Sequence, residues 1–241
     1  MDEGIRLNKY IASCGVCSRR DADALIEKGS VTINGKVAEP GTKVFEGDSV
    51  KVGSKLIKPK DETVVLAYYK PVGVTCTERD VHAEVTVSES LRYKERVTYA
   101  GRLDKDSEGL LLMTNDGKLI TEMMKGSNGH EKEYIVTISK PVTYEFLEKM
   151  SKGIYLKELD KTTRPCVVKK VSKNTFQIVL TQGLNRQIRR MCEACDVKVM
   201  KLKRVRVLNV TIGNLNPGDY RVLSKQEVEK LWKECGNLSK S

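Results

Sequence analysis

No apolar run in this 241-residue chain approaches the ~20 residues that a membrane-spanning helix requires. The first residues, MDEGIRLNKY, lack the apolar core of a secretion signal. The seven cysteines are odd in number and do not have the regular spacing of a disulfide-bonded domain, so we interpret them as reduced thiols. These absences predict a cytoplasmic protein that neither enters a membrane nor is secreted.

The chain is also poor in metal-binding signals. Its two histidines, His82 and His130, lie apart in expected loops, and the pattern assigns neither a role. Two C-x-x-C pairs, Cys14/Cys17 and Cys192/Cys195, have the spacing of zinc or redox sites. The pairs are far apart, lack nearby histidines and have no thioredoxin-like surroundings. We therefore expect no metal site.

Positive charge is in excess, with 43 Lys and Arg against 32 Asp and Glu and a formal net charge of +11. Such a balance favours a polyanionic partner, and nucleic acid before an acidic membrane, because no basic amphipathic helix stands out. The excess lies late in the chain. Residues 183–206 hold eight basic residues against two acidic ones, whereas residues 1–59 hold ten against eight.

Turn and capping signals divide the chain into two parts. Residues 6–13 and 19–28 have the pattern of two short helices, and Asn34-Gly35 between apolar runs predicts a type I′ hairpin. The polar segment 53–62 predicts a linker. We therefore expect an N-terminal domain over residues 1–58 and a second domain over residues 63–241.

The second part is rich in strands that do not alternate regularly with helices. This order predicts an α+β fold, with a small N-terminal α/β domain and a larger mixed, mainly antiparallel sheet with flanking helices. The expected strands are 64–70, 110–114, 133–139, 167–171, 175–181, 197–202 and 205–212, and the expected helices are 117–124, 142–150, 186–194 and 225–235.

A charged loop stands directly before an expected buried strand. Arg102 and Asp104 follow Gly101, and the apolar run Leu110–Met113 comes next. Rigid strands often present reactive side chains in this way. Asp104 is thus a candidate catalytic carboxylate, but it could equally be a loop aspartate of an RNA-binding adaptor, and the loop alone leaves both open.

Four basic residues gather on the two N-terminal helices. These are Arg6, Lys9, Arg19 and Arg20, and they form either a phosphate-binding surface or a solvated helix face. Residues 5–52, which include the Ser18-Arg19-Arg20 helix start and the V-x-I-N-G hairpin, resemble the alpha-L RNA-binding domain. That resemblance implies that these four residues contact structured RNA.

Four further segments carry a second resemblance. They are YYKPVGVTCT at 68–77, AGRLDKDSEGLLLMTNDG at 100–117, HEKEYIVTI at 130–138, and QGLNRQIRRMCEACDVKVMKLKRVRV at 182–207. In this order they resemble the ribosomal RNA pseudouridine synthases of the RsuA and RluB/E/F group, nearest to the branch that acts on large-subunit ribosomal RNA. The resemblance implies an isomerase whose substrate is a uridine in that RNA. It also allows a transfer RNA as a second substrate.

The implied chemistry fits a carboxylate. The C1′–N1 bond breaks, the uracil rotates, and the ring rejoins through C5 without redox change, so we expect no cofactor. The carboxylate either attacks C1′ or removes the C2′ proton, and the sequence does not choose. The family's catalytic positions fall on Asp104, Tyr134 and Arg189. We expect Arg189 to hold Asp104 through a bidentate pair, and a monomer to suffice.

Two RNA contacts are implied beside the expected active site. Arg102 matches the arginine with which relatives fill the stem after a base is flipped out, although a salt bridge to Asp106 or Glu108 is the alternative. Lys132 and Tyr134 lie two apart on one strand and share a face. Without the resemblance, Tyr134 would be interpreted as an ordinary packing residue.

A basic strip follows the last motif. Arg186, Arg189 and Arg190 share one side of the expected helix, and the strip then continues along the next strands. We expect phosphate contacts from Arg186, Arg190, Lys201 and Arg204, with a solvated charged strand as the alternative. A non-catalytic RNA-binding ribosome assembly factor would need this strip and the N-terminal domain, but not Asp104.

Overall fold

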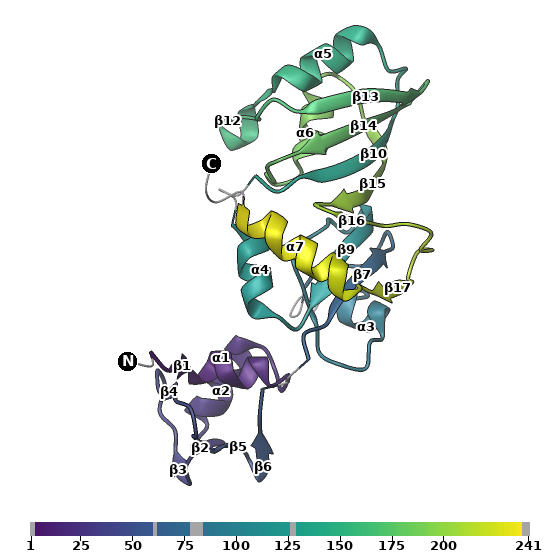
Figure 1. Cartoon of the computed structure of the whole chain (residues 1–241). Helices are drawn as coiled ribbons and strands as arrows, with labels where there is room; N and C mark the ends of the chain where they lie inside the picture. Colours follow the sequence, from purple (N-terminus) through teal and green to yellow (C-terminus); the bar gives the residue numbers. More distant parts are fainter. Residues whose placement is uncertain (1–2, 60–61, 78–83, 126–128, 238–241) are drawn as a thin grey trace. The chain divides into compact units, whose positions relative to one another are not determined.

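The computed structural model describes residues 3–59, 62–77, 84–125 and 129–237. The chain divides into two compact units, whose elements are labelled in Figure 1. The smaller unit holds Met1–Val64 with the short segments Tyr93–Thr98 and Asn115–Gly117, and the larger unit holds the rest. The α+β fold class is confirmed, since helices and mainly antiparallel strands occur in both units.

The smaller unit combines two short helices with small antiparallel sheets. The helices are α1 (Leu7–Ser13) and α2 (Arg19–Glu27), and the Ser18 side chain caps α2 by accepting from the Asp21 N–H. Asn34 and Gly35 have φ values of 50° and 82°, which confirms the predicted type I′ turn. The strands are β1 (Ile5–Arg6), β2 (Val31–Ile33), β3 (Lys36–Val37), β4 (Lys43–Val44), β5 (Val50–Val52) and β6 (Lys55–Ile57).

The predicted linker at 53–62 is wrong over part of its length. Lys55–Ile57 form β6, which pairs with β5 and buries Ile57 in the core of this unit. Gly53 has a φ of 57°, a conformation that glycine adopts at little cost, and it reverses the chain between the two strands. The polar Gly-Ser pair is therefore a hairpin turn.

The larger unit is built on one sheet. Among the described residues nine strands join in it, in the order β13-β14-β10-β15-β9-β7-β17, with β16 beside β15 and β8 beside β9. Neighbours along this order are antiparallel except β15 and β9. The strands are β7 (Val65–Lys70), β8 (Thr98–Tyr99), β9 (Glu108–Thr114), β10 (Lys132–Ile138), β13 (Val167–Ser172), β14 (Thr175–Leu180), β15 (Val199–Val207), β16 (Val210–Thr211) and β17 (Tyr220–Val222). A separate pair is formed by β11 (Tyr155–Leu156) and β12 (Lys161–Thr162).

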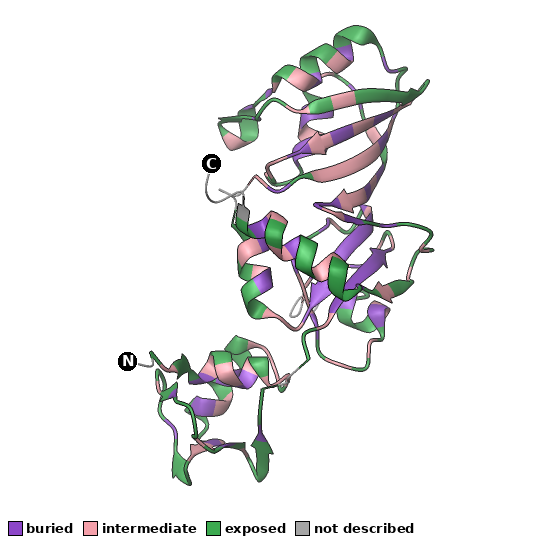
Figure 2. Cartoon of the chain, in the orientation of Figure 1, coloured by how far each residue is buried: buried purple, intermediate pink, exposed green. Residues whose placement is uncertain are grey.

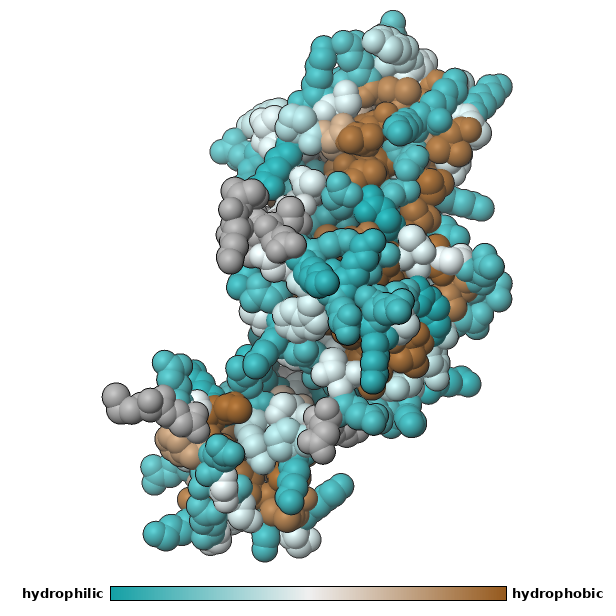
Figure 3. Space-filling model, in the orientation of Figure 1, coloured by the Kyte–Doolittle hydropathy of each residue, from teal (hydrophilic) through white to brown (hydrophobic). Residues whose placement is uncertain are grey.

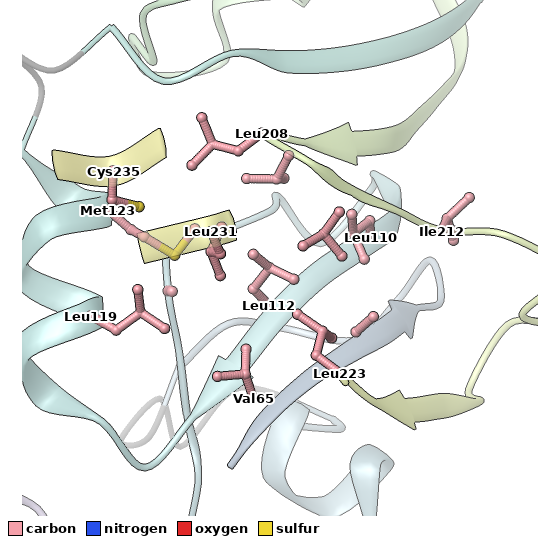
Figure 4. Packing of buried hydrophobic residues seen from close by; sticks show 14 of the residues in the cluster. Val65, Leu110, Leu112, Leu119, Met123, Leu208, Ile212, Leu223, Leu231 and Cys235 are labelled. Carbon is pink, nitrogen blue, oxygen red and sulfur yellow. The ribbon is translucent and has the colours of Figure 1, made fainter. Parts of the chain in front are cut away.

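The strands β7 and β9 form the most buried part of this sheet. All six residues of β7 are buried, as are all but the first of β9 (Figure 2). The helices α4 (Gly117–Met124) and α7 (Lys225–Asn237) supply Leu119, Met123, Leu231 and Cys235 to the same core (Figure 4). Full burial of one such leucine contributes roughly 1.5–3 kcal/mol, so the strand that follows the Asp104 loop is firmly anchored.

A second core lies under the other half of the sheet. The helices α5 (Tyr144–Lys152) and α6 (Gln187–Glu193) pack against β10, β14 and β15. Phe146 of α5 meets Phe176 of β14 edge to face, with ring centroids 5.2 Å apart. Hydrophobic side chains over this half of the sheet are visible in Figure 3. This core fixes α6, which carries the arginines of the last motif.

The structure departs from the predicted elements at several places, and the short strands β8, β11, β12 and β17 were not predicted. Where the pattern predicts strands at 197–202 and 205–212, the structure has one long strand, β15, followed by the short β16. Register shifts against β10 keep β15 paired through its charged residues. The helix α3 (Val87–Leu91) was not predicted, because five residues are too few to show periodicity, although Thr86 and Glu89 form its capping box.

Within the described residues, no helix is both long and apolar enough to cross a lipid bilayer.

Candidate active site

The Asp104 loop is fixed at several points. The Gly73 N–H donates to the Lys105 carbonyl at 2.8 Å, and the Ser107 N–H donates to the Asp104 carbonyl at 3.1 Å. Leu103 is buried, whereas the Asp104 side chain keeps 37% exposure. The loop therefore presents an accessible carboxylate on a constrained backbone, as the sequence predicts.

Asp104 lines a cavity of about 590 Å³ in the larger unit. Residues from separate parts of the sequence meet there, from the Asp104 loop, from β10, from the start of α6 and from β15. Six of the residues singled out from the sequence share the cavity wall: Arg102, Asp104, Lys132, Tyr134, Arg186 and Arg204.

Arg186 is the cation nearest to Asp104 among the described ion pairs. It has a φ of 50°, an uncommon conformation for a non-glycine residue, immediately before α6. Its two terminal nitrogens donate to both carboxylate oxygens of Asp106, at 3.2 and 2.9 Å, and Nη1 lies 3.7 Å from Asp104 Oδ2. One guanidinium thus faces two carboxylates.

These contacts shift two pKa values. Burial tends to raise the pKa of Asp106, but the Arg186 hydrogen bonds and the Arg189 charge outweigh it, so the pKa is lowered. The same hydrogen bonds raise the pKa of Arg186. Asp106 is therefore firmly ionised at neutral pH and holds the guanidinium in place.

The predicted bidentate pair between Arg189 and Asp104 is wrong. Arg189 Nη2 donates to the Asp106 carbonyl at 2.8 Å and to Ser107 Oγ at 3.3 Å, and Nε lies 3.3 Å from Asp106 Oδ2. The left-handed turn at Arg186 starts the helix so that Arg186 faces the cavity and Arg189 lies behind the loop. Arg189 therefore supports the backbone that carries Asp104.

Tyr134 and Lys132 lie on the same face of β10 and both line the cavity, as their spacing predicts. Tyr134 pairs with Ile178 of β14 and Arg204 of β15. Burial and the nearby Arg204 charge lower the pKa of Lys132 to about 8. The only described hydrogen bond of the Lys132 side chain runs from Nζ to the His130 carbonyl, at 3.2 Å.

Arg102 is exposed at the cavity wall. Within the described residues, Arg102 forms no salt bridge to Asp106 or Glu108. Asp106 pairs with Arg186 and Arg189 instead. Glu108 accepts a hydrogen bond from the Tyr69 hydroxyl at 2.8 Å. The Arg102 side chain is therefore available to a bound molecule.

The predicted basic strip is not one surface. Arg204 is 3% exposed and donates to the Leu110 and Arg102 carbonyls, so it lies in the cavity floor. Lys201 is exposed opposite Thr137, on the other face of the sheet from Arg204. Arg190 pairs with Glu158 and also donates to Asn185. The basic residues therefore do not form one surface, because side chains alternate between the two faces of a strand and some pair with nearby acids. A count of charges contains neither effect.

In the smaller unit, Arg6, Lys9, Arg19 and Arg20 are all exposed. No ion pair engages any of the four within the described ranges. This exposure suits a phosphate-binding surface and also a solvated face.

Sequence reasoning missed the role of Asp106, which it considers a possible salt-bridge partner of Arg102. Its signal is the D-x-D spacing of Asp104 and Asp106 combined with two arginines three apart in the last motif. His130 was assigned no role, yet it is 3% exposed at the cavity, and its Nε2 has no partner in the described part of the chain. His82 lies outside the described residues.

The cysteine pairs have the surroundings of packed thiols. All seven cysteines are free, and burial raises the pKa of Cys14 to about 11 and of Cys192 to about 12. The structure puts the two C-x-x-C pairs in different units.

Comparison with known proteins connects both units to RNA. Residues 64–194 match the family model described as RNA pseudouridylate synthase, and residues 5–50 match the S4 domain. The chain is 45% identical over 240 residues to the dual-specificity RNA pseudouridine synthase RluF of Escherichia coli, covering 99% of this chain and 82% of the relative.

Two other relatives extend the comparison. An uncharacterised RNA pseudouridine synthase of Rickettsia felis is 37% identical over 232 residues, covering 93% of this chain and 99% of the relative. A crystal structure of a pseudouridylate synthase matches with a TM-score of 0.69 and 28% identity, over 94% of this chain and 99% of that one. Both similarities span the two units.

Proposed function

Because this chain belongs to the RNA pseudouridylate synthase family, we propose that its Asp104 cavity converts one uridine of large-subunit ribosomal RNA into pseudouridine. The enzymatic class follows from the family: the protein is an RNA pseudouridine synthase, an isomerase that acts on RNA. What we propose beyond the family is the substrate, large-subunit ribosomal RNA. Likeness to a dual-specificity relative supports a transfer RNA as a second substrate.

One observation carries the proposal: an accessible carboxylate stands beside Tyr134 and several cations, in a cavity large enough to admit a flipped base. Asp104 attacks C1′ or removes the C2′ proton, and both routes release the uracil. Tyr134 stacks on the ring and exchanges the proton at C5. Arg189 serves this chemistry by holding the Asp106 carbonyl and the Ser107 hydroxyl.

RNA binding is divided between two proposed domains, an S4-type domain over residues 1–58 and a catalytic domain over residues 63–241. Arg102 fills the stem after the uridine is flipped out. The other proposed contacts come from Arg6, Lys9, Arg19 and Arg20 in the first domain, and from Lys132, Arg186, Arg190, Lys201 and Arg204 in the second.

The isomerisation has no redox step and needs no cofactor by its chemistry. We further propose that the protein acts on RNA as a monomer in the cytoplasm. The alternative, a non-catalytic ribosome assembly factor, is not favoured, because the similarity extends through the catalytic motifs.

The test is tritium release from large-subunit ribosomal RNA labelled at uracil C5. The protein should release tritium from one site, and Asp104→Asn should release none. Asp196→Asn is the matched control, since Asp196 is an exposed carboxylate with a φ of 55° that asparagine tolerates equally well. Absence of release with any ribosomal fragment, or equal release by Asp104→Asn, would overturn the proposal.

A further inference from the structure

Among the residues that the structure describes, two cations in the floor of the Asp104 cavity have no carboxylate partner. Lys132 Nζ donates to the His130 carbonyl at 3.2 Å, and Arg204 donates to the Leu110 carbonyl at 2.7 Å and the Arg102 carbonyl at 3.4 Å. Within the described residues neither forms an ion pair. Carbonyl oxygens satisfy the N–H groups but leave the charge without a counter-ion.

Lys132 has no described carboxylate partner, although two glutamates lie beside it in the sequence. Glu131 and Glu133 flank it, but both pair with Arg206, at 2.9 and 2.8 Å. Alternation along β10 places those carboxylates away from Lys132 and Tyr134. The strand therefore separates its charges and leaves positive potential on the cavity side.

The pairing of β10 with β15 places Lys132 and Arg204 next to each other. Arg204 is opposite Tyr134 in the register of β10 and β15, and Lys132 is two residues along the same strand. The Arg204 charge adds to burial in lowering the pKa of Lys132 to about 8. Like charges held together in a low-dielectric cavity favour an anion there.

We propose that Lys132, supported by Arg204, stabilises the uracil ring as an anion during the interval in which it is detached from C1′. This inference rests on the proposed function and assigns a catalytic role to a residue expected only to contact RNA. When the C1′–N1 bond breaks, its electron pair stays on the ring and is shared by N1, O2, O4 and C5. C5 then bonds to C1′, as Asp104 leaves C1′ or returns the C2′ proton. The proton leaves C5 through the Tyr134 hydroxyl and a proton is taken up at N1, so the ring ends neutral. Lys132 stays protonated throughout, and both routes open to Asp104 form the same anion.

Depth in the cavity favours the base over a phosphate as the occupant. The exposed cations at this cavity are Arg102, Lys105, Lys125 and Arg186, which suit the RNA backbone. Arg204 is 3% exposed and Lys132 is partly buried on the Tyr134 face, where a flipped base would lie. A preorganised donor in such a site is typically worth roughly 10²–10³-fold in rate.

Single-turnover kinetics at saturating RNA provide the test. Lys132→Met should slow the reaction by roughly 10²–10³-fold while the RNA Kd stays within about twofold, and Lys132→Arg should keep most of the rate. Lys169→Met, an exposed lysine on the edge strand β13, is the matched control and should react like the wild type. A wild-type rate in Lys132→Met, or a loss that appears only in Kd, would overturn the inference.

A pH profile separates catalysis from a structural role. The wild-type rate should fall above pH 8 as Lys132 loses its proton, whereas Lys132→Arg should keep its rate there. The titratable groups around Lys132 are Arg204 on β15, His130 and Tyr134 on its own side, Asp104 and Cys76 on the loops, Arg186 before α6, and the exposed Arg102, Lys105 and Lys125. All of these groups remain in Lys132→Arg. If the rate of that variant also fell above pH 8, as in the wild type, the inference would be contradicted.

This comparison also separates the inference from the proposed function. If the wild type modifies no RNA, the proposed function fails. If the wild type is active and Lys132→Met is equally fast, only the role of Lys132 fails. Should Lys132→Met fold poorly, the pH profile of Lys132→Arg still decides.

Discussion

Arg186 Nη1 lies 3.7 Å from Asp104 Oδ2, beyond hydrogen-bond distance, because Asp106 holds the same guanidinium at 2.9 and 3.2 Å. Asp104 therefore has a cation beside it but is not neutralised by a close pair. A carboxylate in this state is still free to react. Asp106 acts as a positioning residue that limits how tightly Arg186 can bind Asp104.

Replacing Asp106 by asparagine tests that arrangement. Without the Asp106 charge, Arg186 should close onto Asp104 and hinder its reaction. We expect Asp106→Asn to lower the single-turnover rate about tenfold, equivalent to roughly 1.4 kcal/mol, with little change in RNA Kd. Asp196→Asn should leave both quantities unchanged. An unaltered rate in Asp106→Asn would show that Asp104 does not depend on this competition.

Arg102 should matter more for a paired uridine than for an unpaired one. Flipping a base out of a stem costs a few kcal/mol, and Arg102 is exposed without an ion pair in the described residues. Arg102→Met should therefore slow modification of a stem-loop at least tenfold more than that of an RNA with the same uridine unpaired. Rates on the two RNAs, measured with one enzyme preparation, give the comparison. Equal losses on both would exclude the wedge role.

Local signals in the sequence predict much of this structure. The helix start at Ser18 and the Asn34-Gly35 turn both form where the residues indicate. The Asp104 loop and its buried strand also follow directly from charge and apolar pattern. Such features depend on residues that are close together in the sequence, so the sequence alone is enough to predict them.

Partner choice between distant residues could not be predicted in this way. Arg186 precedes α6 and Arg189 lies three residues on, within it, and the left-handed turn at Arg186 decides which of them faces Asp104. Likewise, the burial of Arg204 depends on two carbonyls supplied by other segments. Counts of charge along the chain contain no information on either point.

Gly109 shows how closely β9 approaches β15. A Cβ at this position would lie 2.2 Å from the Arg204 carbonyl oxygen, and the φ of 109° disfavours any side chain. Gly109→Ala should therefore cost on the order of 3 kcal/mol, lowering Tm by about 6–12 °C in a domain of this size. Gly183→Ala, where a Cβ would meet nothing within 4 Å, is the control for thermal unfolding. A Tm within 2 °C of the wild type (a shift worth under about 1 kcal/mol) would contradict the close approach.

The basic residues of the smaller unit should determine the salt dependence of RNA binding. Changing Arg6, Lys9, Arg19 and Arg20 together to glutamine should weaken binding and reduce the slope of log K against log salt by up to about 0.7–0.9 per lost phosphate contact. Since all four are exposed, Tm should hardly change. The matched control replaces four exposed lysines of the same unit, Lys36, Lys51, Lys55 and Lys58. An equal effect from the control would mean that net charge, and not this surface, binds the RNA.

Glu227 should make the stability of the larger unit depend on pH. Its carboxylate accepts from Arg221 at 2.8 and 2.9 Å and from the Ser224 N–H at 2.9 Å, and these bonds lower its pKa from 4.5 to about 2. Because the folded pKa is the lower one, the stabilisation is complete above pH 4.5 and is lost as the pH falls toward 2. With 31% of the side chain exposed, we expect about 1–2 kcal/mol at pH 7.

Denaturant unfolding of the wild type and Glu227→Gln at several pH values measures that contribution. The variant should be less stable at pH 7, and the difference should shrink as the pH is lowered below 4.5, because protonation removes the same charge from the wild type. Glu229→Gln, an exposed neighbour on α7, should show little difference at any pH. A difference for Glu227→Gln that stays constant across this range would mean that hydrogen-bond geometry, and not the carboxylate charge, holds the start of α7.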